Sequence, residues 1–173
     1  MIRKNVTTVP SFSQQYVDQV PEDMDLLEAL ERFGVSFIEQ HQKAYASLEK
    51  KVYAPGKWTI HQIMEHINDA ERVFAYRAMR FARGDQSALV GMDQEVFTAG
   101  GNANDRAIYD IIDEFKHVRQ STIALFRSFD SNHLTMSGPA SEMEFSVGAL
   151  GFMICGHLLH HHQIIEERYY PLI

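Results

Sequence analysis

The chain has 173 residues, of which 45% are hydrophobic and 23% charged, so it is long enough to fold as one domain with a sizeable core. Its formal net charge is −7 with histidine neutral, and no basic stripe follows a predicted helix, which argues against a nucleic-acid partner. The single cysteine, Cys155, excludes an internal disulfide and favours a reducing, cytoplasmic location.

The first 20 residues are expected to be irregular, because Pro10 and Pro21 bracket a polar segment that has no apolar core of the signal-peptide kind. Pro21 suits the first turn of a helix, and apolar residues at three-to-four spacing then predict one helix to about Leu48. Pro55 and Gly56 form the turn that follows.

A second helix is predicted from Thr59 to about Arg83, opening on a capping box formed by Thr59 and Gln62. The connection that follows, residues 84–104, is long for a compact domain, so we expect it to be functional or to pack as its own unit. Its length also allows the second and third helices to run parallel.

The third apolar stripe covers residues 105–129, and a polar loop over residues 131–145 could hold a short hairpin. The fourth helix is predicted from Ser146, a favourable N-cap residue, to about Tyr169. It contains the most apolar stretch, residues 147–162, which is short for a membrane span and ends in histidines. We therefore predict an all-α, single-domain four-helix bundle over residues 1–173 that does not contact a membrane.

Four of the nine histidines lie in the fourth helix, at positions 157, 160, 161 and 162. His157 and His161 lie one turn apart on the same helix face, so their imidazoles can converge on one metal ion. They share this face with apolar residues, which indicates that they point inward, whereas His162 is expected to reach solvent.

A third ligand from another helix is needed, because a catalytic zinc site has three protein ligands and one open position. His66 is the best candidate, since it lies in phase with Ile63 and Ala70 on the apolar side of the second helix. His61 lies near the start of that helix and is less inward by phase.

The competing interpretation is that these are hydrogen-bonded core histidines, which is the commoner role for a lone buried histidine and suits His66 taken alone. It is weaker for His157 and His161 together, because two buried imidazoles would need two separate partners, whereas one ion satisfies both. Spacing alone leaves both interpretations open.

Three carboxylates flank His66, and a carboxylate often accepts the free ring N–H of a ligand histidine. These residues are Glu65, Asp69 and Glu71. Their competing interpretation is a solvated helix face, which we favour for Glu65. Cys155 lies about 200° around the helix from His157, so we expect it to face away from the ion as a small buried residue.

Two segments together resemble the DinB/YfiT-like superfamily, namely KWTIHQIMEHINDAERVF in the second helix and GHLLHHHQIIEERYY in the fourth. The Trp-Thr opening, the histidine eight residues after Trp58 and the His-x-x-His-His run carry the resemblance, which covers nearly the whole chain. It implies a four-helix bundle of up-down-down-up order, often a homodimer, that binds zinc or nickel through three histidines. Matched position by position, these ligands are His66, His157 and His161.

The resemblance also implies a small-molecule substrate and leaves three functions open. The first is a metal-dependent S-transferase that joins a low-molecular-weight thiol, such as bacillithiol, to an electrophile; the absence of an obvious protein nucleophile suits it. The second is a metal-dependent hydrolase, with water at the open position. The third is a non-enzymatic bundle with a closed structural site, for which His160 is the remaining fourth ligand. We rank them in this order.

Overall fold

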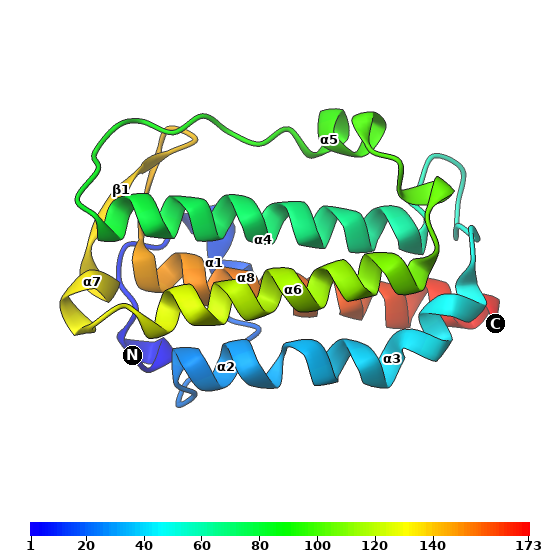
Figure 1. Ribbon diagram of the computed structural model, residues 1–173, viewed down its shortest axis with the longest axis horizontal. Helices are drawn as coiled ribbons and strands as arrows, with labels where there is room; N and C mark the ends of the chain where they lie inside the picture. Colours follow the sequence, from blue (N-terminus) through cyan, green and yellow to red (C-terminus); the bar gives the residue numbers. More distant parts are fainter.

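Four long helical stretches form the body of the protein, as the apolar stripes of the sequence predict (Figure 1). The computed structural model describes residues 1–173, and the protein is mostly helical. Its helices are α1 (Gln14–Val17), α2 (Leu26–Arg32), α3 (Val35–Leu48), α4 (Ile60–Ala82), α5 (Gln94–Gly100), α6 (Ile108–Arg127), α7 (Ser131–Thr135) and α8 (Val147–Ile164), the last continued by a π-helical turn, Ile165–Tyr169. No helix combines the length and apolar character needed to cross a membrane.

The connection between α4 and α6 runs back along α4 to the end at which that helix began (Figure 1). In this view α2, α3 and α8 run from left to right, and α4 and α6 run from right to left. The connection has structure of its own, because it contains α5 and a 3-10 turn, Ala103–Asp105. The first 20 residues likewise contain α1 and two 3-10 turns, Arg3–Asn5 and Ser11–Ser13.

The first predicted helix is wrong in one respect, because it is broken into α2 and α3 at Gly34. A Cβ atom at Gly34 would lie 2.6 Å from the carbonyl oxygen of Leu30, so only glycine permits this close turn. The break leaves backbone carbonyls without helical partners, and the guanidinium of Arg119 donates to those of Leu30, at 3.1 Å, and Phe33.

The other helix ends match their predicted signals. Thr59 and Gln62 form the capping box of α4, and the Ser146 hydroxyl accepts a hydrogen bond from the Ala149 amide at 3.2 Å. The loop before α8 contains the hairpin that its composition allowed, β1 (Ser137–Ala140) paired antiparallel with β2 (Met143–Ser146). Its two-residue turn places both Ser141 and Glu142 at positive φ, which is the geometry of a type I′ turn.

The interior consists of two apolar clusters separated by polar groups. One cluster lies at the hairpin end of the bundle and includes Phe81, Phe126 and Phe152, and the other lies towards the C-terminus and includes Ile63 and Phe115. The buried polar residues between them come from the middle turns of α4, α6 and α8. They are His66, Asn68, Glu71, Arg119, Thr122 and His157. A polar layer therefore crosses the middle of an otherwise apolar core.

Arg119 and Glu71 form the central ion pair of this layer. Both Glu71 carboxylate oxygens accept hydrogen bonds from the guanidinium at 2.8 Å, and the two side chains are 0% and 2% exposed. Removing either partner would leave an uncompensated buried charge, which costs several kcal/mol, about 3–5. This pair has a structural role, because it links α6 to α4 and to the α2–α3 break.

Candidate metal centre

Three histidines from two helices converge on one point of the polar layer. His66 projects from α4, and His157 and His161 project from successive turns of α8. The Nε2 atom of His157 lies 3.1 Å from Nε2 of His66 and 3.0 Å from Nε2 of His161. The structure thus brings together the three residues that phase and family resemblance both selected.

Burial keeps these imidazoles neutral. His66 and His157 are 6% and 7% exposed, and the low polarity around them lowers the pKa of His66 to about 4 and that of His161 to about 3. The pKa of His157 is held well below its ordinary value by burial and then by the neighbouring histidines. At neutral pH every ring therefore has a free lone pair, which is the form that binds a metal ion.

Hydrogen bonding among the three rings cannot satisfy their nitrogens. A neutral imidazole nitrogen carries either one hydrogen or one lone pair, so Nε2 of His157 can form only one good hydrogen bond. It nevertheless faces Nε2 atoms of both His66 and His161 at about the same distance. The three rings therefore need a partner that accepts electron pairs from several nitrogens at once.

A divalent cation is such a partner, and the spacing fits one. Nitrogen ligands at about 2.0–2.1 Å from a tetrahedral ion lie about 3.3 Å apart, and about 3.0 Å apart in cis octahedral positions. The candidate ligand atoms of His66, His157 and His161 all lie within 4.8 Å of one another. No fourth histidine, cysteine or carboxylate belongs to this group, so a bound ion would keep a position for another ligand.

Aromatic side chains surround the histidine cluster. The Trp58 ring lies 5.0 Å from that of His66, and the Tyr16 and Phe74 rings approach His157 edge-on at 5.5 and 5.9 Å. Tyr16 can come this close because α1 packs on α8 at Gly156, where a Cβ atom would lie 1.7 Å from the Tyr16 carbonyl oxygen. The glycine therefore positions a ring of the site.

Two small cavities meet at the histidines. The first has a volume of about 180 Å³ and is lined by His66 and His157, and the second has about 230 Å³ and is lined by His161. Gln94, at the start of α5, lines both. The connection over residues 84–104 thus contributes to the walls of the site, as expected for a loop of this length.

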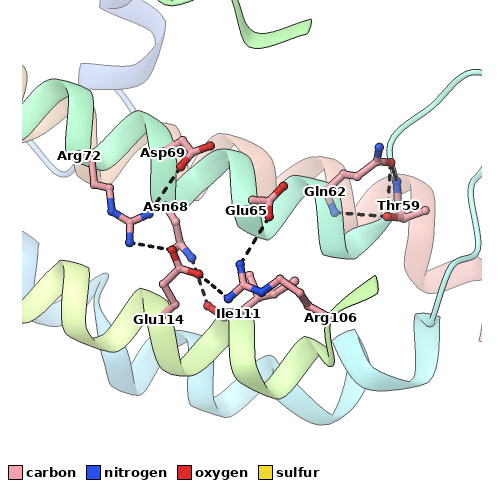
Figure 2. A network of polar contacts seen from close by, with 9 residues as sticks. All are labelled: Thr59, Gln62, Glu65, Asn68, Asp69, Arg72, Arg106, Ile111 and Glu114. Carbon is pink, nitrogen blue, oxygen red and sulfur yellow. Dashed lines mark hydrogen bonds and ion pairs between the residues drawn. The ribbon is translucent and has the colours of Figure 1, made fainter. Parts of the chain in front are cut away.

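The carboxylates that flank His66 do not support it, contrary to one expectation from the sequence. Glu65 pairs with Arg106 at 3.4 Å and Asp69 with Arg72 of the same helix at 3.5 Å (Figure 2). Glu71 pairs with Arg119, and Nδ1 of His66 is buried without any hydrogen-bond partner. The expectation failed because all three carboxylates pair with arginines, two of which are distant in sequence, and a charge-assisted pair is stronger than a bond to neutral imidazole.

The remaining histidines of the sequence argument lie outside the cluster. The expectation that His162 reaches solvent is wrong. The residue is 7% exposed, and its Nδ1 atom shares a hydrogen bond of 2.8 Å with the Tyr45 hydroxyl. His61 is also buried, at 7% exposed, but belongs to no metal-ligand group. His160 lies beside Tyr16 and is not part of the group either. Cys155 is fully buried among apolar residues, as expected.

Sequence reasoning missed three residues of the cavity walls. Tyr16 came from a segment expected to be irregular, and Gln94 and Ser141 came from loops, where no periodicity shows what a side chain faces. A fourth, Arg77, did leave a signal. It lies eleven residues after His66, which is three helical turns, and therefore on the same face of α4.

Comparison with known proteins identifies the family of the chain. The family model of the DinB superfamily matches residues 15–165, which includes all three histidines. The chain belongs to the DinB superfamily. No curated protein sequence matches the chain.

A solved structure shares the DinB fold. YfiT from Bacillus subtilis, described as a probable metal-dependent hydrolase with an unusual four-helix bundle topology, is similar with a TM-score of 0.71 at 13% sequence identity. The match covers 96% of this chain and 91% of YfiT. At this identity the likeness concerns the fold, and it confirms a helical bundle of the DinB type.

Proposed function

We propose that this DinB-family protein is a metal-dependent S-transferase that joins a low-molecular-weight thiol to an electrophilic small molecule. The ion would be held by His66, His157 and His161. The observation that carries the proposal is the Nε2 atom of His157, which faces two other nitrogens and can satisfy only one of them without an ion. The up-down-down-up helix order belongs to the same proposal and is supported by the helix directions in Figure 1.

The donor set suits a borderline-soft divalent cation. Three neutral imidazoles are compatible with zinc and nickel, which we take as the first candidates. When bound, such an ion supplies positive charge that favours the thiolate form of a thiol placed beside it. The histidines hold their lone pairs free at neutral pH, and the surrounding aromatic rings keep the local dielectric low.

The surroundings of the cluster favour a thiol over water as the attacking group. Activation of water calls for a nearby general base, and the three carboxylates close in sequence to His66 are all engaged by arginines. A thiol needs less assistance because its ordinary pKa, about 8.5, is already close to neutrality. The absence of a reactive cysteine agrees, since burial raises the pKa of Cys155 to about 12 and keeps it inert.

The test uses bacillithiol and a chlorodinitrobenzene, with zinc-loaded or nickel-loaded protein. In the reaction a carbon–sulfur bond forms, the carbon–chlorine bond breaks, chloride leaves with its electron pair, and the thiol proton passes to solvent. We expect the rate of adduct formation, followed by absorbance, to depend on added metal and to be lost in His157→Ala. A rate equal to that of the His157→Ala variant, with both metals and with an epoxide as second electrophile, would reject the proposal.

A hydrolase is the second candidate, because YfiT has this description and because Tyr16 lines the cavity beside His157. Burial raises the pKa of Tyr16, so its hydroxyl stays protonated and can donate a hydrogen bond to a substrate carbonyl. Metal-dependent hydrolysis of model esters that falls in Tyr16→Phe, without any thiol present, would favour this candidate over the transferase.

A further inference from the structure

The cavity that begins at the neutral rings of His66 and His157 extends along α4 to a charged side chain, Arg77. The walls between are mostly apolar and aromatic, with Phe74, Phe145 and Met153 among them. Arg77 is 5% exposed and lies three helical turns from His66, about 16 Å along the axis. An arginine so deeply buried in an apolar wall is rare unless an anion pairs with it.

No carboxylate of the chain pairs with Arg77. Its Nη2 donates to the Val90 carbonyl oxygen at 3.0 Å and to the Ser141 hydroxyl at 3.2 Å, both of which are neutral. Its Nε and Nη1 groups make no hydrogen bond within the protein. The other deeply buried arginine, Arg119, does have an anionic partner, because both carboxylate oxygens of Glu71 accept hydrogen bonds from it.

The contacts to Nη2 hold the guanidinium in place without neutralising it. Val90 and Ser141 are themselves fixed to one another, because the Leu89 amide donates to Pro139 and the Ser141 amide donates to Leu89, at 3.0 and 2.9 Å. The loop after α4 and the β1–β2 hairpin thus form one support for Nη2. Nη2 is thus anchored, and the separate Nε–H and Nη1–H donors are left for a ligand.

We propose that Arg77 binds a carboxylate on a small molecule whose reacting atom lies at the histidine cluster. A carboxylate oxygen can accept a charge-assisted hydrogen bond from a free N–H of the guanidinium, and its negative charge removes the cost of an unpaired buried charge. A cavity of about 180 Å³ admits only a small molecule, whose charged end and reactive end would lie in the same cavity. This inference rests on the proposed function for the nature of the reacting atom, but not for the carboxylate.

The experiment measures binding without turnover, so that it stands even if the transferase proposal fails. The ligands are 4-chloro-3-nitrobenzoate and its methyl ester, and, as a second pair, 3-mercaptopropionate and its methyl ester. Isothermal titration calorimetry gives Kd for each with the full-length protein, metal-loaded and metal-free. In the wild type we expect at least one acid to bind about tenfold or more tightly than its ester, the gain typical of a hydrogen-bonded charged group. The pair that shows the preference identifies which cosubstrate carries the carboxylate.

Three variants separate Arg77 from other sources of the preference. In Arg77→Met the acid and ester should bind within about threefold of each other, and Arg77→Lys, which keeps the charge, should retain part of the preference. The matched control, Arg168→Met, removes an exposed arginine outside the cavity and should leave the preference intact. If Arg77→Met does not fold, the ratio of the acid and ester Kd values in Arg77→Lys, compared with that of the wild type, tests the inference instead.

Any of three results would overturn the inference. One is equal binding of acid and ester by the wild type for both pairs. Another is a preference that survives in Arg77→Met. The third is a preference that disappears when the metal is removed from the wild type, since the carboxylate would then be bound by the ion. If Arg77 had only a structural role, Arg77→Met would lose stability, but the ratio of the acid and ester Kd values would not change.

Discussion

Two histidine clusters lie on opposite sides of α8, and adjacent residues divide between them. His161 belongs to the candidate metal centre with His66 and His157, whereas His162 packs against His41, with ring centroids 4.1 Å apart. Burial lowers the pKa of both kinds of histidine, that of His66 to about 4 and that of His162 also to about 4. Burial and a low pKa therefore do not distinguish a metal ligand from a core histidine.

The clusters differ in the partners available to each nitrogen. His162 meets the Tyr45 hydroxyl at 2.8 Å through Nδ1 and lies 3.4 Å from Glu166 through Nε2, while His41 meets the Tyr170 hydroxyl at 3.2 Å. Hydroxyls both donate and accept, so they satisfy either tautomer. In the first cluster the Nε2 atoms face only one another, and a shared cation would satisfy all three.

The largest expected effect is on metal affinity. His157→Ala should weaken zinc or nickel binding at least about 100-fold, because loss of a ligand costs at least as much as loss of a partner that supports one. The matched change His162→Gln, in the other cluster, should alter Kd less than about threefold. Competition with a chromophoric chelator measures both. Equal losses in the two variants would mean that the clusters do not differ as described.

A smaller effect is expected on the stability of the metal-free protein. His162→Phe removes the partner of the Tyr45 hydroxyl, which is buried at 1% residue exposure, and should lower the free energy of unfolding by about 1–3 kcal/mol. The double variant with Tyr45→Phe should recover part of this loss, because neither polar group is then left unpaired. Urea denaturation of the four proteins gives the coupling; a coupling near zero would contradict the hydrogen bond.

The smallest effect is on the pH dependence of the same metal-free protein. The folded-state pKa of His66, about 4, lies below its ordinary value of about 6.5, so the unfolded chain takes up the proton first and stability falls as the pH drops through this window. Between pH 7 and 5.5 the share of His66 is about 1 kcal/mol, which His66→Gln should remove. His162→Gln should remove a similar share. A flat profile in the wild type would contradict the burial of both rings.

Helical phase was sufficient to predict which three histidines converge, but only on the face where the pattern is simple. His66, His157 and His161 each lie in phase with apolar neighbours of their own helix, and the structure brings the three together. His162 was misplaced because α8 is covered on both sides, with Tyr45 of α3 on the second one. The sequence did carry that signal, since residues 147–156 are apolar on every face, which indicates a fully buried helix.

Other failures involve partners that are distant in the chain. The break at Gly34 depends on Arg119 of α6, and the positions of Glu65 and Glu71 depend on Arg106, just before α6, and on Arg119. Local propensity contains no information on such pairs, whereas caps such as Thr59 with Gln62 and Ser146 are local and were predicted correctly.

The partition of space around the histidines has a consequence for the order of events. Because His66 and His157 border one cavity and His161 borders the other, there is room for two different molecules beside the same histidine cluster. Neither has to leave before the second arrives. Such a layout is suited to direct transfer within a ternary complex, in which Gln94 lines the binding cavities of both molecules.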